Sequence, residues 1–262
     1  MRFKLTILRT IYTLTRMNRA LPPNAKKVTA KPGATLTTEQ VYEHVLDAIV
    51  DQRAAPGTRL NELAMCKVFG ISRRDMAQVL LRLSFNSLAV IVPNRGAFVS
   101  SPDVAEARAI FATRKIIEAG VLESVAQRAS GADYRALDQN IADEEAARLA
   151  GRMRDAIRLS GAFHLLLAQI AGNPLVTDLI RQLVARTSLV TSLYENPDGL
   201  MCWHDDHGAI VKLIRAHRPK PAVALMQRHL DHLEESLNLN GNARSKADLR
   251  TIFRAGTFKI GT

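Results

Sequence analysis

The segment from Arg59 to Val99 constrains the fold of this chain more than any other stretch. Its pattern predicts two short helices with a tight turn between them. Asn61 and Ser72 stand where the two helices would begin, because their short polar side chains can accept hydrogen bonds from the first free amides of a helix. Gly70 can adopt the left-handed backbone that a tight turn requires. The segment therefore begins as a helix-turn-helix.

A β-hairpin should follow the second helix. The β-branched run LAVIV ends at the turn sequence PNRG, and the short run AFV can return beside it. Two helices, a turn and such a hairpin make a winged helix-turn-helix, which places its second helix in the major groove of double-stranded DNA. The alternative is a helical hairpin that happens to precede a β-hairpin.

Apolar spacing predicts the buried faces of these helices. The first short helix should turn Leu63, Cys66 and Val68 inward, and Ile71 should pack beneath the turn. In the second helix, the expected buried stripe is Met76, Val79, Leu80 and Leu83.

An earlier helix completes the predicted three-helix core. Thr37 and Gln40 form a capping box, in which each side chain can bond the backbone amide of the other residue. The helix should end near Arg53. Its expected apolar face is Val41, Val45, Leu46, Ile49 and Val50.

The net charge of +11 is unevenly placed. Residues 1–102 hold 15 Lys and Arg against 6 Asp and Glu, whereas residues 103–262 hold 21 against 19. Eight of the basic residues lie within 1–32, which contain no acidic residue. The predicted winged helix therefore has a surplus of only one positive charge, and its DNA contacts must depend on particular arginines rather than on bulk charge.

We expect four regions along the chain. Residues 1–36 would be a basic, disordered arm, with a membrane-surface helix or a targeting segment as the alternatives. Residues 37–100 would form the winged helix-turn-helix, 103–239 a helical domain and 240–262 a flexible basic tail. Charges interrupt the apolar runs of the arm, so no membrane span is expected. Two distant cysteines suggest no disulfide, which favours a reducing cytoplasm.

From Asp103 to about Asn238 the pattern is helical, with no strand signal. Ser130-Gly131, Gly172-Asn173-Pro174 and the proline-rich stretch 218–221 separate long amphipathic segments. Six helices of this length predict an all-α bundle. The fold class is therefore mainly α, with a small β-hairpin wing.

Several polar side chains are candidates for DNA contact. Arginine donates two parallel hydrogen bonds to guanine, and the start of a recognition helix faces the base edges. The wing tip reaches phosphates or the minor groove. The expected DNA-contacting residues are Arg59, Ser72, Arg73, Arg74, Gln78, Arg82, Asn94, Arg95 and Gly96.

Three histidines, His164, His207 and His229, lie on three different predicted helices of the bundle. Imidazoles from facing helices can converge on one cation in a bundle core. A histidine on an apolar face can equally be a satisfied core residue, so spacing alone leaves a metal site and a plain core open. The acidic pairs in Asp143-Glu144-Glu145 and Asp205-Asp206 suggest solvated helix charges rather than acid–base pairs.

The first predicted domain resembles the DNA-binding domain of the GntR transcription regulators. The residues that carry the resemblance are Pro56-Gly57, Arg59-Leu60-Asn61-Glu62, Ser72-Arg73, Leu80, Arg82-Leu83 and Pro93-Asn94-Arg95-Gly96-Ala97-Phe98-Val99. After Ser-Arg the chain departs from the family pattern, because Arg74-Asp75 and Ala77-Gln78 replace the usual residues. The resemblance implies a dimer that reads a near-palindromic operator. The changed residues indicate that the operator sequence differs from the one typical of the family.

The second domain resembles the FCD ligand-binding domain of the FadR subfamily. The matching residues are Arg114 with Glu118, Phe163-His164, Ala171-Gly172-Asn173-Pro174, His207 with Ile210, and Met226 with His229-Leu230. The resemblance implies that His164, His207 and His229 bind a divalent metal such as Zn, Ni or Mn. Ser160 stands at the family's carboxylate ligand position. Water or an effector would then complete the site, or the pocket would hold no metal.

An anionic effector, such as a carboxylate, would suit this pocket, with Arg114 as its partner. The alternative for Arg114 is a salt bridge with Glu118, one helical turn further along the same helix. The expected effector-binding residues are Arg114, Ser160, His164, Cys202, His207 and His229. The chain carries no nucleophile elbow, HExxH, P-loop or dinucleotide fingerprint, so we expect no enzyme. The main hypothesis is a cytoplasmic homodimeric regulator, most simply a repressor, which an effector releases from DNA. A metal-dependent enzyme and an architectural DNA binder with an idle helical domain are the alternatives.

Overall fold

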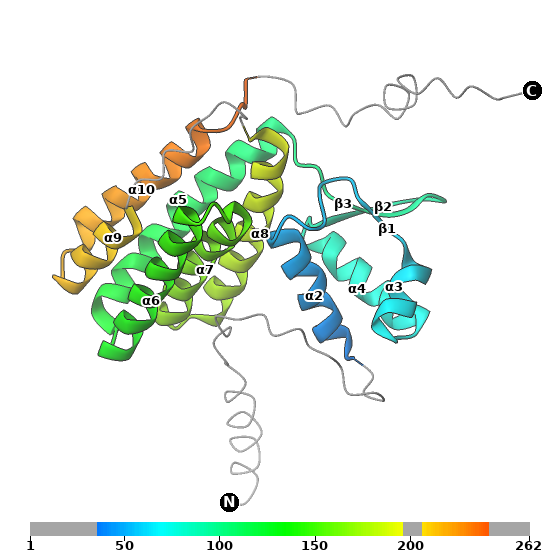
Figure 1. Cartoon of the computed structure of the whole chain (residues 1–262), viewed down its shortest axis with the longest axis horizontal. Coiled ribbons are helices and arrows are strands. Elements are labelled where there is room, and N and C mark those ends of the chain that lie inside the picture. The colour runs from blue at the N-terminus through cyan, green and yellow to red at the C-terminus, as the bar shows by residue number, and fades with distance from the viewer. Residues whose placement is uncertain (1–35, 196–205, 241–262) are drawn as a thin grey trace, which may run out of the picture. The chain divides into compact units, whose positions relative to one another are not determined.

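The structure is a computed structural model that describes residues 36–195 and 206–240. The described residues belong to one compact unit. Helices dominate it, and its strands form one small sheet (Figure 1), which confirms the predicted fold class. The elements are α2 (Thr38–Val50), β1 (Arg59–Leu60), α3 (Glu62–Phe69), α4 (Arg73–Phe85), β2 (Ala89–Val92), β3 (Gly96–Val99), α5 (Val104–Arg128), α6 (Gly131–Leu149), α7 (Met153–Ala171), α8 (Pro174–Tyr194), α9 (Asp206–Arg215) and α10 (Pro219–Glu235).

The predicted caps start the first helices as expected. Thr37 and Gln40 form the capping box of α2, and the side chain of Asn61 accepts the Ala64 amide at 3.0 Å. Gly70 ends α3 with φ 68°, a left-handed backbone that glycine adopts without steric cost. Ser72 caps α4. These local signals bound each helix before any packing is considered.

The sheet has one strand more than predicted. β1 pairs antiparallel with β3 through Arg59↔Phe98 and Leu60↔Ala97, and β2 pairs with the other edge of β3. A strand of two residues is too short to show an alternating pattern in the sequence, and neighbouring backbone hydrogen bonds define it instead. The extra strand places Arg59 beside the wing.

The core of the first domain confirms most of the predicted faces. All four expected residues of α4 are buried, as are Val41, Val45, Leu46 and Ile49 of α2. The predicted inward face of α3 was wrong, because Leu63 and Val68 are 55% and 76% exposed. Helix α3 has only eight residues and buries none of them fully, so Met65, Cys66 and Phe69 pack against the core only in part.

The second domain is the predicted helical bundle, of which the structure describes α5 to α10. Asp103 caps α5, and Gly172 ends α7 with φ 77°. This left-handed backbone is one that glycine adopts without steric cost. Ile116 of α5 is 75% exposed and lies outside the bundle core.

Helix α8 joins two hydrophobic cores. Most of its buried apolar residues belong to the bundle core, including Ile180 and Val190. Ala185 and Leu189 lie instead in the core of the winged helix-turn-helix. The last turn of α2 therefore packs on a helix that is also central to the bundle.

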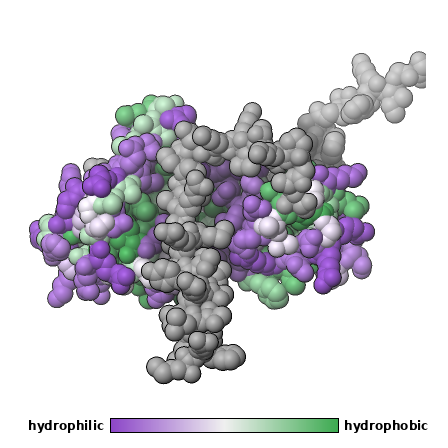
Figure 2. Space-filling model, turned by 90° about the horizontal axis from the view of Figure 1, so that it is seen from below, coloured by the Kyte–Doolittle hydropathy of each residue, from purple (hydrophilic) through white to green (hydrophobic). Residues whose placement is uncertain are grey.

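Several expectations fall on residues that the structure does not describe. The expected arm, apart from Leu36, most of the expected tail, and Cys202 lie outside the described residues. Among the described helices, none combines the length and apolar character that a membrane span requires. In the face shown in Figure 2, hydrophilic residues cover most of the described surface and hydrophobic residues form smaller patches.

Candidate functional site

The three predicted histidines meet in one cavity of the helical domain. His164 lies on α7, His207 at the start of α9 and His229 on α10. All three line a cavity of about 90 Å³, together with Arg114 of α5 and Ser160 of α7. Since a buried water needs roughly 10–15 Å³ of such volume, the cavity has room for a small metabolite and little more.

The imidazoles are close enough to share one ion. One ring nitrogen of each histidine lies within 4.8 Å of the others, and the Nε2 atoms of His207 and His229 are 3.2 Å apart. Two nitrogens bound to one tetrahedral zinc at 2.0–2.1 Å would lie about 3.3 Å apart. The His207–His229 separation therefore suits two ligands of one cation.

Each histidine has a carboxylate at its other ring nitrogen. The Nδ1 atoms of His164, His207 and His229 lie 2.5, 2.8 and 3.4 Å from Glu118, Glu144 and Asp206, respectively. A hydrogen on each Nδ1 would be donated to the carboxylate and would leave each Nε2 with its lone pair for a metal. Such outer partners fix the ring and the tautomer of metal-binding histidines.

Two of these carboxylates correct the sequence interpretation. Glu144 and Asp206 were expected to be solvated helix charges, yet their side chains are only 11% and 14% exposed. The sequence gives no direct signal for them, because acidic residues on polar helices are usually exposed. Only the fold brings each of them to the Nδ1 atom of a histidine, where it can orient the ring.

Arg114 and Glu118 form a buried ion pair beside the histidines. Arg114 Nε donates to Glu118 Oε1 at 2.8 Å, and both side chains are 2% exposed. Arg114 Nη1 also donates to Thr187 Oγ1 at 3.3 Å. Its Nη2 is buried and has no hydrogen-bond partner among the described residues. A buried unpaired donor is costly, so this atom marks the place where a ligand oxygen would be welcome.

The surroundings of Glu118 and His164 keep the carboxylate of Glu118 charged and the imidazole of His164 neutral. Burial raises the pKa of Glu118, but Arg114 and His164 outweigh it and lower the pKa to about 2. Burial lowers the pKa of His164 to about 3, against the opposing effect of Glu118. Burial also lowers the pKa of His229. Neutral imidazoles are the form that binds metals.

The donor set therefore fits a divalent metal. Three imidazoles with oriented rings suit Zn or Ni better than Mn, which prefers oxygen ligands. Ser160 lines the cavity where the family resemblance implies a carboxylate, and it adds only a neutral hydroxyl. Three protein nitrogens would leave coordination positions for water or an anionic ligand.

The predicted DNA-contacting residues lie on α4 and around the hairpin. Ser72, Arg73, Arg74 and Gln78 are exposed at the start of α4. Arg73 Nε donates to Glu62 Oε1 of α3 at 3.0 Å, which leaves its two terminal nitrogens available. The Ser72 hydroxyl is already engaged, because it caps α4 and donates to Asp75 at 2.7 Å.

The remaining candidates differ in how free they are. Asn94, Arg95 and Gly96 are exposed at the wing, and Arg59 lies against Gly96, 3.9 Å from where a Cβ would be. The last candidate, Arg82, forms an ion pair with Glu39 of α2 and stacks on the Tyr42 ring. Its guanidinium is therefore held by α2, unlike those of Arg74 and Arg95.

Comparison with known proteins agrees with this architecture. Residues 37–99 match the family model "Bacterial regulatory proteins, gntR family", and residues 109–232 match the FCD domain. The HTH-type transcriptional repressor RspR of Escherichia coli (strain K12) is 28% identical over 203 residues, which cover 76% of this chain and 88% of RspR.

Two solved structures share the fold. A protein of Rhodococcus sp. RHA1 described as a GntR transcriptional regulator has a TM-score of 0.67 at 20% identity, over 79% of this chain and 99% of that one. E. coli McbR/YncC has a TM-score of 0.65 at 17% identity, over 76% and 97%.

A winged helix-turn-helix followed by an FCD bundle defines a class of transcription regulators. The chain belongs to the GntR family, in the FadR-like subfamily that carries an FCD domain. Its relatives are transcriptional regulators rather than enzymes.

Proposed function

We propose that this protein is a homodimeric repressor whose hold on operator DNA is controlled by a small anionic metabolite. The metabolite would bind in the helical domain with a divalent metal on His164, His207 and His229. The observation that carries the proposal is the cavity itself, which is lined by the three histidines and by Arg114, whose Nη2 has no hydrogen-bond partner among the described residues. We propose repression rather than activation because the relative RspR is a repressor. A DNA partner in a bacterium places the protein in the cytoplasm.

The two binding partners would use separate groups. Arg73, Arg74 and Gln78 would read base edges, while Arg59 and Arg95 would hold the backbone. Two copies would place two recognition helices on a near-palindromic site. In the helical domain, Arg114 would pair with the anion, and the metal would supply a positive charge and open positions for its oxygens. Effector control requires that the effector binds the free and DNA-bound geometries with different affinity.

The operator prediction is tested with Arg73→Ala. Loss of a bidentate contact to guanine should weaken operator binding by about 1–3 kcal/mol, which is roughly 5- to 150-fold. Fluorescence anisotropy on DNA from upstream of the gene, at fixed salt, measures the change. The control is Arg108→Ala, an exposed arginine of α5. Undiminished specific binding by Arg73→Ala would exclude the assignment of α4 as the reading helix.

Glu62→Gln tests whether Glu62 positions Arg73. Exposed ion pairs contribute about 0.2–1 kcal/mol, so operator affinity should fall about two- to fivefold. Removal of a negative charge near DNA would by itself strengthen binding, so the positioning role predicts the opposite sign. Glu123→Gln on α5 is the matched control, and non-specific DNA is the second readout. Equal or tighter operator binding by Glu62→Gln would contradict the role.

A further inference from the structure

The cavity that holds the histidines has one wall from the winged helix-turn-helix. Val50, the last residue of α2, lines it beside Ser160, Val184 and Ser188. Helix α2 packs on the recognition helix α4 through their shared core. A ligand in the cavity would therefore lie against the DNA-binding domain itself, without an intervening layer.

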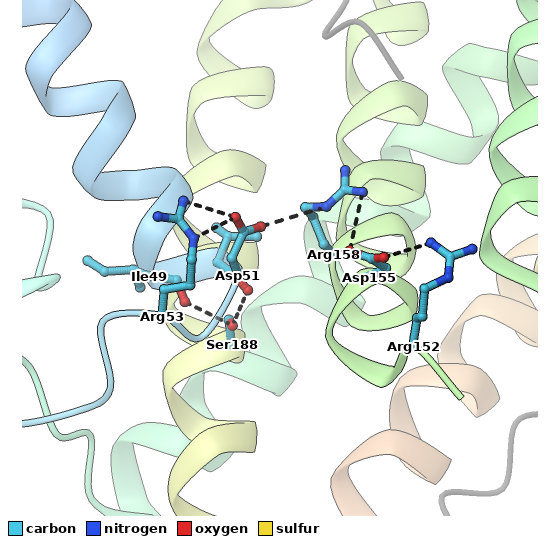
Figure 3. A network of polar contacts seen from close by, with 8 residues as sticks. Ile49, Asp51, Arg53, Arg152, Asp155, Arg158 and Ser188 are labelled. Carbon is cyan, nitrogen blue, oxygen red and sulfur yellow. Dashed lines mark hydrogen bonds and ion pairs between the residues drawn. The ribbon is translucent and has the colours of Figure 1, made fainter. Parts of the chain in front are cut away.

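Ser188 of α8 binds the end of α2 directly. Its Oγ lies 2.9 Å from the Val50 carbonyl oxygen and 3.3 Å from the Ile49 carbonyl oxygen. Figure 3 shows Ser188 next to Ile49 at this end of α2. The last carbonyls of a helix lack partners within the helix, so a buried hydroxyl that donates to them fixes the helix end. Ser188 is 5% exposed, so the contact is shielded from bulk solvent.

The ligand-facing arginine contacts the adjacent residue of the same helix. Arg114 Nη1 donates to Thr187 Oγ1, and Thr187 immediately precedes Ser188 on α8. Thr187 and Ser188 both line the cavity. A ligand that pairs with Arg114 thus acts one residue away from the contact that holds α2.

Ion pairs continue this contact toward solvent. Asp51, the C-cap of α2, binds Arg53 at 3.0 Å and lies 3.7 Å from Arg158 of α7 (Figure 3). Arg158 is two residues from Ser160, which lines the cavity. Two of the helices that line the cavity, α7 and α8, are therefore linked to the same end of α2.

From these contacts we infer that the C-terminal turn of α2 is part of the effector pocket, and that the Ser188 contact to its carbonyls transmits pocket occupancy to the DNA-binding domain. Val50 is then a ligand-facing residue and Ser188 a positioning residue. The inference rests on the proposed function, because it assumes that the pocket and the operator are linked.

The test measures operator affinity with and without Zn²⁺ alone, using the full chain and fluorescence anisotropy. In the wild type, Zn²⁺ should change the operator Kd at least tenfold. In Ser188→Ala, the change should fall below twofold while the Kd for Zn²⁺, measured by calorimetry, stays within twofold of the wild type. Ser124→Ala, which removes a hydroxyl bonded to the Gly120 carbonyl of α5, is the matched control and should keep the tenfold response.

A second variant needs no ligand. Ser160→Leu fills part of the cavity and should change operator affinity at least fivefold in the wild-type background, but less than twofold when combined with Ser188→Ala. Circular dichroism checks that each variant is folded. A tenfold Zn²⁺ response that survives in Ser188→Ala overturns the inference and leaves the proposed function standing. An unchanged Kd in both the Zn²⁺ and the Ser160→Leu experiments also overturns it, whereas a wild type without operator binding overturns the proposed function as well.

Discussion

Glu118→Gln should destabilise the protein by about 3–5 kcal/mol, the cost of breaking a buried ion pair while one charge remains. The Glu118 carboxylate bonds both Arg114 and His164 at 2% exposure. Because Arg114 and His164 hold its pKa at about 2, Glu118 is charged at every pH where the protein would be studied. Glutamine has a similar shape but no charge, so Arg114 would stay buried and unpaired.

Urea denaturation followed by circular dichroism measures this loss. The matched control is Glu123→Gln, an exposed position on the same helix, which should change the free energy of unfolding by less than about 0.5 kcal/mol. A loss below about 1 kcal/mol for Glu118→Gln would show that Arg114 finds solvent or another partner. Arg114 Nη2 would then have no need of a ligand oxygen.

His207→Ala should reduce divalent metal affinity by more than about 100-fold. It removes one of three nitrogen ligands, whereas the loss of an outer hydrogen-bond partner costs about 10- to 100-fold. Glu144→Gln, which changes only the partner of His207 Nδ1, should therefore have the smaller effect. Metal content after gentle purification, and titration with Zn²⁺ and Ni²⁺, measure both.

The control for this series is His217→Ala. His217 lies outside the cluster, beyond the end of α9, and its Nδ1 contacts the Ala126 carbonyl. It should leave metal content unchanged. Equal, near-zero metal in the wild type and in His207→Ala would refute the metal site, and the cavity would then be a polar pocket for the effector alone.

The fold of this protein could be predicted mainly where local chemistry decides. Thr37, Asn61 and Ser72 each cap the helix expected of them, and Gly70 and Gly172 end helices as glycine residues usually do. These signals act within a few residues, so they can be recognised without knowledge of tertiary contacts. The apolar stripe of α4 was equally clear because its four residues recur at helical spacing over about two turns.

Tertiary context decided what the sequence pattern could not. Leu63 and Val68 have the spacing of an inward face, but α3 lies too far out to bury them. Tyr42 was not expected in the core, yet it is 3% exposed and its hydroxyl accepts from Asn86 at 2.7 Å. A tyrosine can be buried when its polar end finds such a partner, which only the assembled fold provides.

The sequence predicted the three histidines of the candidate site but not all of the carboxylates that contact their Nδ1 atoms. His164, His207 and His229 converge as expected. Glu144 and Asp206 were missed because nothing in a helical sequence indicates that an acidic residue faces a histidine sixty or twenty residues away. Arg114 was expected either to bind an anion or to pair with Glu118. The structure shows the ion pair, and the same guanidinium keeps one nitrogen without a partner among the described residues.

Helix α8 gives this protein a boundary that differs from the one in its sequence. The chain passes from the winged helix to the bundle near Ser100-Ser101-Pro102, yet Ala185 and Leu189 complete the hydrophobic core of the first domain from far downstream. Residues 37–100 alone would expose the apolar surface that these two side chains cover. A chimaera that takes its winged helix-turn-helix from a related regulator must therefore also take the face of α8 that packs on it. A fusion at the linker alone would leave the two faces mismatched.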